Sequence, residues 1–258
     1  MDEIRVIDLP AGRRDLPLRW SGRSRALWAV PFLLLMLMMP SESRGQAEVW
    51  LDYFANFPAG RYWTYEGNAG IAKGVTHPVW LDTYLTGNAT YQDQNWLSTE
   101  GNLEAHYTFN TAAEDLFELR PWVGLNFIWP TYGEHWNLFY PSFSVRFEDR
   151  FLWYQSTGTQ ETKQRMRLRV SARFPLNNQT LTVGTYYLLF LLEGYVPLNG
   201  EVREMSADRK RFQAGVGYVV ASNLRVELQY ILMRTRNTEL NTFETTSHIA
   251  WLAVRNFF

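Results

Sequence analysis

Arginine recurs at alternate positions in one segment of this sequence, and this spacing gives the strongest indication of chemistry. From Arg165 to Phe174, four arginines and a serine occupy one set of alternate positions, and apolar residues occupy the other. Alternate residues of a β-strand point to opposite faces, so a strand here carries a charged row behind an apolar row. Guanidinium groups bind carboxylates and other oxyanions in bidentate fashion. The row therefore predicts either anion binding or ion pairs with carboxylates on neighbouring strands.

Charged and apolar residues also alternate in other segments, and there the two signs are mixed. Arg146, Glu148 and Arg150 share one face of their predicted strand, as do Arg225 and Glu227 of theirs. Such residues can pair across strands inside a narrow barrel, which offsets the penalty of leaving bulk water. The candidate site is the set of charged residues predicted to face that lumen: Glu118, Arg120, Arg146, Glu148, Arg150, Arg165, Arg167, Arg169, Arg173, Glu193, Arg211, Arg225 and Glu227.

These charges support two functional readings. The excess of arginine in 165–173 favours a narrow channel or binding site for small anionic solutes. The mixed signs favour a closed barrel with a structural or envelope-maintenance role, in which carboxylate–arginine pairs fill the interior. The sequence leaves both readings open, and it does not identify a solute.

No recognisable catalytic motif accompanies these rows. The sequence lacks the His-Glu-x-x-His and Gly-x-Ser-x-Gly patterns and a phosphate-binding glycine loop. Ser247 and His248 are neighbours, so on a strand their side chains point to opposite faces. We predict no catalytic residue; the alternative is a lipid or peptide hydrolase with its site at the barrel rim, tested at His106 or His135. The four histidines are His77, His106, His135 and His248.

Metal ions and cofactors are not expected either. Glu114 and Asp115 form a short acidic cluster, which reads as a solvated loop because Ca²⁺ sites need six or more converging oxygens. The chain has no cysteine, so it offers no thiolate ligand and no disulfide. Its net charge of −1 argues against a nucleic-acid partner, which requires a basic surface.

Alternation with period two continues along the rest of the chain and predicts strands throughout. Eleven candidate strands can be delimited, whereas a bacterial single-chain barrel has an even number. We therefore expect an all-β, up-and-down antiparallel transmembrane barrel of ten to twelve strands, with one strand split or missed. The candidate strands are 49–57, 61–72, 79–90, 96–109, 116–129, 137–154, 163–174, 180–196, 208–220, 224–235 and 246–258.

The N-terminal segment has the order of a secretory signal peptide. Basic residues from Arg13 to Arg25 precede an uncharged run from Ala26 to Met39, and Gly45-Gln46-Ala47 supplies small residues for cleavage. The run is shorter than the about 20 residues of a spanning helix, and an uncleaved anchor is the alternative. We predict a cleaved signal peptide over 1–47 and a barrel over 48–258.

The final strand resembles the signal by which assembly machinery recognises outer-membrane barrels. The chain ends in Phe258, and Ala250, Leu252 and Val254 precede it at alternate positions. Asn256 departs from that pattern, which usually has an apolar residue there. The resemblance implies a bacterial outer-membrane protein, with membrane lipid and the assembly machinery as partners; a soluble periplasmic barrel is the alternative.

A wider resemblance covers nearly all of the predicted mature chain. The segments 118–122, 146–151 and 165–169, followed by Glu193-Gly194 and 211–215, occur in the order found in domain-of-unknown-function family 2490. The sequence is identified as similar to the barrels of that family. This resemblance implies an outer-membrane β-barrel and assigns no activity to it.

Overall fold

A computed structural model describes residues 45–110, 114–129, 140–178, 180–199, 209–237 and 242–258. The region Gly45–Phe258 is one compact unit. The predicted signal peptide falls almost entirely outside the described residues, although the first strand begins at Gln46, before the predicted mature start at Glu48. Among the described residues, no helix has the length and apolar character that crossing a membrane would require.

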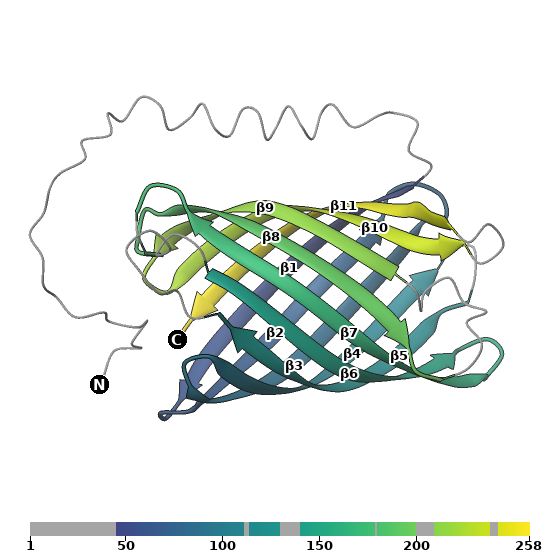
Figure 1. The fold of residues 1–258 in the computed structure, drawn as a ribbon. Coiled ribbons are helices and arrows are strands. Elements are labelled where there is room, and N and C mark those ends of the chain that lie inside the picture. The colour runs from purple at the N-terminus through teal and green to yellow at the C-terminus, as the bar shows by residue number, and fades with distance from the viewer. Residues whose placement is uncertain (1–44, 111–113, 130–139, 179, 200–208, 238–241) are drawn as a thin grey trace, which may run out of the picture. The chain divides into compact units, whose positions relative to one another are not determined.

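The described residues form a single closed sheet of eleven strands (Figure 1). Each strand follows one of the sequence-predicted ranges, so the predicted all-β barrel is correct in its architecture. The strands are β1 Gln46–Ala59, β2 Trp63–Gly74, β3 Trp80–Gln94, β4 Leu97–Asn110, β5 Leu116–Ile128, β6 Tyr140–Tyr154, β7 Gln160–Pro175, β8 Tyr186–Pro197, β9 Arg209–Ala221, β10 Leu224–Asn237 and β11 Thr242–Phe257.

The barrel closes through a parallel pair, which corrects the expectation of an entirely antiparallel sheet. Consecutive strands pair antiparallel, whereas β1 and β11 pair parallel from Gln46 opposite Ser247 to Asn56 opposite Phe257. Strand direction alternates along an up-and-down sheet, so an odd number of strands brings the first and last together in the same direction. For the described chain, the inference that one of eleven strands was split or missed is therefore wrong. The C-terminus lies at the end of the barrel away from the start of β1 (Figure 1).

One strand begins later than the alternation predicts. The range 180–196 was expected to be extended, but β8 starts at Tyr186. The side chain of Asn177 donates to the Gly184 carbonyl at 2.9 Å and accepts from the Tyr186 backbone amide at 2.8 Å. Gly184 has a φ of 83°, a left-handed conformation that suits a turn. These local hydrogen bonds stabilise a turn between β7 and β8 and prevent the residues before Tyr186 from joining the strand.

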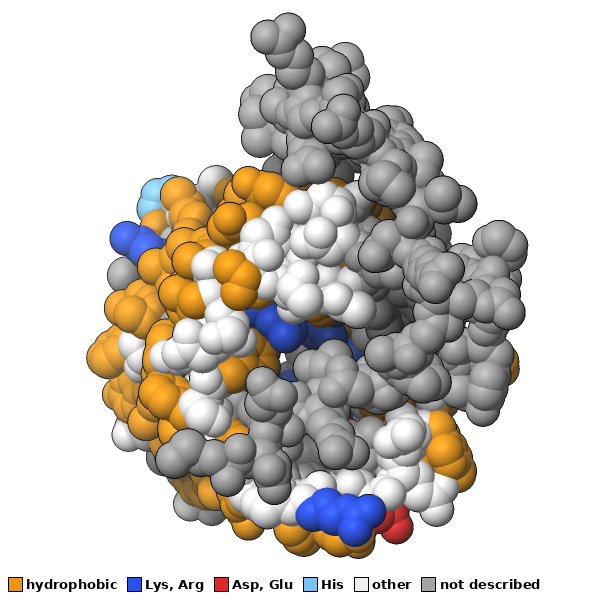
Figure 2. Space-filling model, turned by 90° about the vertical axis from the view of Figure 1, so that its left-hand side faces the viewer, with side chains coloured by type: hydrophobic (Ala, Val, Ile, Leu, Met, Phe, Trp, Pro, Cys, Tyr) orange, Lys and Arg blue, Asp and Glu red, His pale blue; other side chains and the backbone are white. Residues whose placement is uncertain are grey.

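The two faces of the strands have opposite chemistry. On β7, Arg167 is 7% exposed, whereas Val170 is 50% exposed. On β6, Glu148 is buried and its neighbour Phe147 is exposed. Viewed from the end that holds the C-terminus, hydrophobic side chains surround the barrel and Lys or Arg side chains appear within its mouth (Figure 2). The charged rows thus lie inside, and the apolar rows form the outer surface.

Two tyrosine rings lie across interior glycines that sit directly opposite them. Tyr187 is fully buried and faces Gly217, where an added Cβ would lie 2.2 Å from the ring. Tyr84 is related in the same way to Gly70, with an added Cβ 2.3 Å from its ring. The absent side chains make room for the rings, which hold hydrogen bonds to carboxylates in the lumen.

We expect Gly217→Ala to lower the free energy of unfolding by about 1–3 kcal/mol, because the buried Tyr187 ring must move to admit the methyl group. Gly87→Ala is the matched control, since nothing lies within 4 Å of its added Cβ, and it should change stability by less than about 0.5 kcal/mol. Urea unfolding followed by tryptophan fluorescence measures both. Equal effects at the two positions would contradict this packing.

Candidate functional site

The candidate site is an interior cavity of about 690 Å³ whose walls carry most of the predicted charged residues. Its lining comes from all eleven strands and is rich in Arg, Asp, Glu, Trp and Asn side chains. Arg173, Arg225 and Glu227 lie beyond this cavity, and Glu148 and Glu193 are buried behind its lining arginines, all on the same strand faces. The arrangement places guanidinium and carboxylate groups in one enclosed space, where interactions between them are stronger than in bulk water.

Glu148 is the first of two carboxylate hubs in this space. It accepts hydrogen bonds from Arg165 Nη2 at 2.5 Å and from Arg167 Nη1 at 3.2 Å. Arg120 Nε lies 3.2 Å from its Oε1 atom. Because Glu148 and Arg165 are direct cross-strand partners on β6 and β7, the sheet register itself forms this pair.

Glu193 is the second hub. It accepts from Arg167 Nη2 at 3.0 and 3.1 Å, from Arg169 Nε at 3.0 Å and from Tyr195 Oη at 2.7 Å. Arg211 Nη1 lies further away, at 3.9 Å. Arg167 therefore bridges the two hubs, and one charge network runs across β6, β7 and β8.

The network continues on the neighbouring strands through two further carboxylates. Glu118 binds Arg150 through two bonds of 2.6 and 2.9 Å and also binds Arg120 at 2.9 Å. Glu104 accepts from Arg120 Nη1 at 2.9 Å and from Trp122 Nε1 at 2.8 Å. Glu104 was not among the predicted site residues, although its alternation with apolar Leu103 and Ala105 on β4 carried the required signal.

These ion pairs lie along the barrel wall and do not cross the lumen. The pairs described here join residues of one strand, of adjacent strands or of strands two apart in the ring. From β4 to β9, six arginines (120, 150, 165, 167, 169 and 211) share four carboxylates (104, 118, 148 and 193), whereas the rest of the cavity lining carries Glu48, Asp52, Glu66 and Asp82. This part of the wall is therefore richer in guanidinium than in carboxylate groups, and none of the described ion pairs crosses the cavity beside it.

Two arginines of this wall form no hydrogen bond with described residues. Arg211 is 9% exposed, and its guanidinium faces the rings of Trp50 and Trp251 at 5.5 and 5.6 Å. Arg146 stacks over Trp122 at 4.0 Å. The Nε atoms of both arginines are buried and lack an acceptor. Their positive charges lie against aromatic faces and 3.7 and 3.9 Å from Glu100 and Glu193, and this leaves N–H groups available to another acceptor.

The last predicted charges lie nearer the end of the barrel that holds the C-terminus. Arg225 stacks over Phe257 at 4.6 Å, and Arg173 is exposed. Glu227 instead binds Arg255, at 3.3 Å, and Tyr187, at 2.8 Å. Arg255 is absent from the predicted set, because the strongest pattern of its strand is the apolar alternation that ends at Phe258. Phe258 itself stacks on Phe57, with ring centroids 4.9 Å apart.

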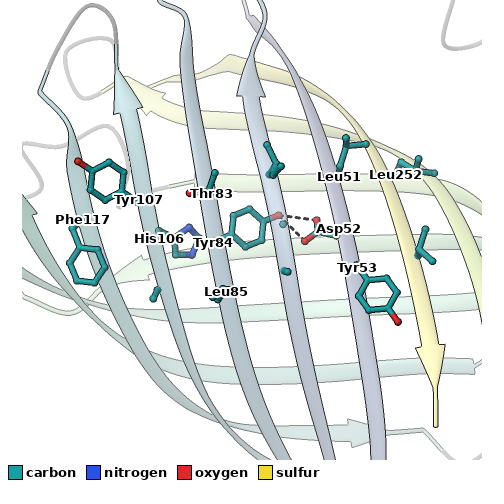
Figure 3. Close-up of a pocket in the computed structure, with 15 residues that line it drawn as sticks. Leu51, Asp52, Tyr53, Thr83, Tyr84, Leu85, His106, Tyr107, Phe117 and Leu252 are labelled. Carbon is teal, nitrogen blue, oxygen red and sulfur yellow. Dashed lines mark hydrogen bonds between the residues drawn. The ribbon is translucent and has the colours of Figure 1, made fainter.

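The opposite wall carries a second polar cluster that the sequence did not reveal. Asp52 accepts hydrogen bonds from Trp251 Nε1 at 2.5 Å, Asn68 Nδ2 at 2.8 Å and Tyr84 Oη at 2.8 Å. The Tyr84 ring stacks against His106 at 5.0 Å, and Figure 3 shows the three side chains Asp52, Tyr84 and His106 in sequence across β1, β3 and β4. This carboxylate is satisfied by neutral donors, so it stabilises the wall where β1 meets β11.

The histidines do not form a nucleophile–base pair among the described residues. His106 Nδ1 lies 2.9 Å from Asp82, and its Nε2 lies 3.4 Å from Glu104. Ser247 lines the cavity, whereas His248 bonds to Tyr230, so the two neighbours point to opposite faces. His135 lies outside the described residues. Within the described part of the chain, no three His, Asp or Glu side chains converge as they would around a metal ion.

Comparison with known proteins gives one match. The model of the family described as "Protein of unknown function (DUF2490)" matches residues 47–244. That span begins in β1 and ends in β11, and it includes all the sequence-predicted interior charges. No curated protein and no solved structure matches the chain.

We expect Glu193→Gln to destabilise the barrel by about 3–5 kcal/mol, because it removes the carboxylate that Arg167 and Arg169 share and leaves the buried Arg167 with Glu148 alone. The control is Glu161→Gln, which removes a 2.7 Å pair with Lys163 whose side chains are 40% and 25% exposed. That change should cost about 1 kcal/mol or less. Urea unfolding of the two variants checks the difference, and comparable losses would contradict the hub role of Glu193.

Proposed function

We propose that this chain, which belongs to the DUF2490 family, is an outer-membrane β-barrel whose lumen binds or passes small solutes that carry an anionic group. In this proposal, the signal peptide at 1–47 directs export, and the assembly machinery recognises the last strand with its terminal Phe258. The observation that carries the proposed activity is the excess of arginine over carboxylate on the β4–β9 part of the lumen wall, where Arg146 and Arg211 form only long ion pairs and no described hydrogen bond.

A membrane location is supported by the outer surface of the barrel. Leu85 is 66% exposed, and apolar residues such as Val123 and Leu228 are also exposed on other strands. A continuous apolar surface of this kind is unfavourable in water and suits a bilayer. Outward-facing aromatic residues also cluster at both ends of the barrel, for example Trp63 with Tyr91, and Phe117 with Trp153. Such girdles are typical of the two interfaces of a membrane barrel.

Solute binding is supported by the location of the charges. The ion pairs coat the wall, so a cavity of about 690 Å³ is left beside a cationic surface. A guanidinium that lies over an indole ring can still donate N–H groups to a carboxylate in bidentate fashion. Burying such a group without an acceptor is unfavourable, so an anionic solute would stabilise Arg146 and Arg211.

The second candidate is a closed barrel with a structural role in the envelope. It is favoured by the completeness of the two hubs, since Glu148 and Glu193 each contact three arginines and are themselves fully buried. A network of that kind can serve conformational specificity alone. The two candidates differ in whether ions cross the lumen.

The membrane part of the proposal predicts that the protein fractionates with the outer membrane. In detergent, the unheated barrel should migrate differently from the heated chain on a gel, because a closed sheet resists unfolding by detergent. Recovery of the folded protein in the soluble periplasmic fraction would contradict this location and favour the soluble alternative.

The solute part predicts anion-selective conductance of the purified barrel in planar bilayers. Replacing both Arg146 and Arg211 with Gln should lower the chloride-to-potassium permeability ratio severalfold, as read from the reversal potential in a KCl gradient. Arg61→Gln, in the exposed turn after β1, is the charge-matched control and should leave the ratio unchanged. A complete lack of channel events would instead support the closed, structural barrel.

A further inference from the structure

His106 lies where the acidic part of the lumen wall meets the arginine-rich part. Its Nδ1 atom is 2.9 Å from Asp82 on β3, and its Nε2 atom is 3.4 Å from Glu104 on its own strand, β4. The imidazole and the two carboxylates are enclosed, with side-chain exposures of 14%, 16% and 14%. The ring also stacks against Tyr84, as Figure 3 shows.

These two contacts require a proton on each ring nitrogen of His106. A neutral imidazole has one N–H group and one lone pair, whereas an imidazolium ion donates from both nitrogens. An ionised carboxylate only accepts, so a neutral ring would turn its lone pair towards the oxygen of Asp82 or Glu104. Between these two carboxylates, His106 therefore carries both protons and a positive charge.

The carboxylates beside His106 would keep other donors if the imidazole lost a proton. Asp82 also accepts from Thr108 at 3.1 Å, and Glu104 also accepts from Arg120 at 2.9 Å. Loss of the proton would therefore change the charge of the lumen and leave each carboxylate with a bond. The titratable and charged groups that face the imidazole are Asp82 and Tyr84 on β3, Glu104 on β4, Glu118 and Arg120 on β5, and Asp52 on β1 behind Tyr84.

The charges around the cavity are nearly balanced, so a single proton changes the sign of their sum or cancels it. Eight arginines line the cavity in the described part of the chain. Nine carboxylates accompany them, namely six in the lining, the two hubs Glu148 and Glu193, and Glu100 beside Arg146. A protonated His106 brings the net charge of this set from −1 to zero. Because His106 lines the same cavity, a solute inside it is exposed to that change.

We propose that His106 is a proton-responsive selectivity determinant of the lumen, whose protonated form favours anionic solutes. With the proton in place, the charge of Asp82 or Glu104 is offset, and the arginines on β5–β9 dominate the field that a solute meets. Without it, the carboxylates on β1–β4 repel an anion more strongly. This inference rests on the proposed function, because it names what regulates that lumen.

The first test is the pH dependence of ion selectivity of the purified barrel in planar bilayers. The chloride-to-potassium permeability ratio should fall about threefold between about pH 5 and about pH 9, since one unit charge several ångströms from the ion path is lost. His106→Gln keeps an N–H donor but cannot titrate, so it should remove most of this change. His77→Gln, in the exposed turn after β2, is the matched control and should keep the full change.

The second test follows the proton itself and does not depend on conduction. Ring nitrogen resonances of histidine in the isotope-labelled barrel distinguish imidazolium from neutral imidazole, and their loss in His106→Gln identifies the signal. His106 should be an imidazolium at the acidic end of the range and lose its proton over the same pH interval in which the permeability ratio falls. Heat-modifiable migration on a gel confirms that each variant is folded, and the pH profile of the unaltered barrel stands without any variant.

Two results would overturn the inference and leave the proposed function in place. One is an anion-selective barrel whose permeability ratio is independent of pH, or changes equally in His106→Gln. The other is a His106 ring that stays neutral throughout the range. No channel events at any pH would instead defeat solute passage and, with it, the selectivity role of His106.

Discussion

The structure depends on pairing charge inside a closed sheet. A carboxylate or guanidinium removed from water destabilises a protein by several kcal/mol unless an opposite charge and hydrogen bonds compensate. Glu148 and Glu193 meet this requirement for most of the arginines on β7, since Arg167 bridges both hubs. The arginine row is therefore compatible with folding only because two glutamates on the flanking strands face it. The compensation is weaker at Arg146 and Arg211, which lie against tryptophan rings and 3.7 and 3.9 Å from their nearest carboxylates.

The alignment of neighbouring strands decides whether the charges can pair and whether the barrel can close. A shift by one residue would turn every charged side chain towards the apolar surface, so each strand pair must hold its alignment. The direct pairs Glu148 with Arg165 and Arg169 with Glu193 fix β6, β7 and β8 relative to one another. At the closure, the bond from Trp251 to Asp52 links the last and first strands, and the parallel pairing follows from the odd strand count.

Much of this arrangement could be predicted from local alternation, because period two is a property of neighbours in the chain. The strand faces on β6 and β7 were readable for that reason, and so was the family resemblance, which the match over residues 47–244 confirms. The odd number of strands could not be predicted in this way, because it depends on how the first and last strands pair when the barrel closes. The role of Asp52 could not be predicted either, since its partner Trp251 is 199 residues away and only the register brings them together. The predicted signal peptide lies outside the described residues and remains a prediction.

The central claim is that the guanidinium rows face an enclosed lumen while the alternate apolar rows face lipid. Since the chain has no native cysteine, single cysteines at consecutive positions 165–170 can each carry one fluorophore in a barrel reconstituted into vesicles. Quenching by a lipid-confined quencher should be strong at positions 166, 168 and 170 and weak at 165, 167 and 169. Quenching that is strongest at the arginine positions, or that shows no alternation, would contradict the account.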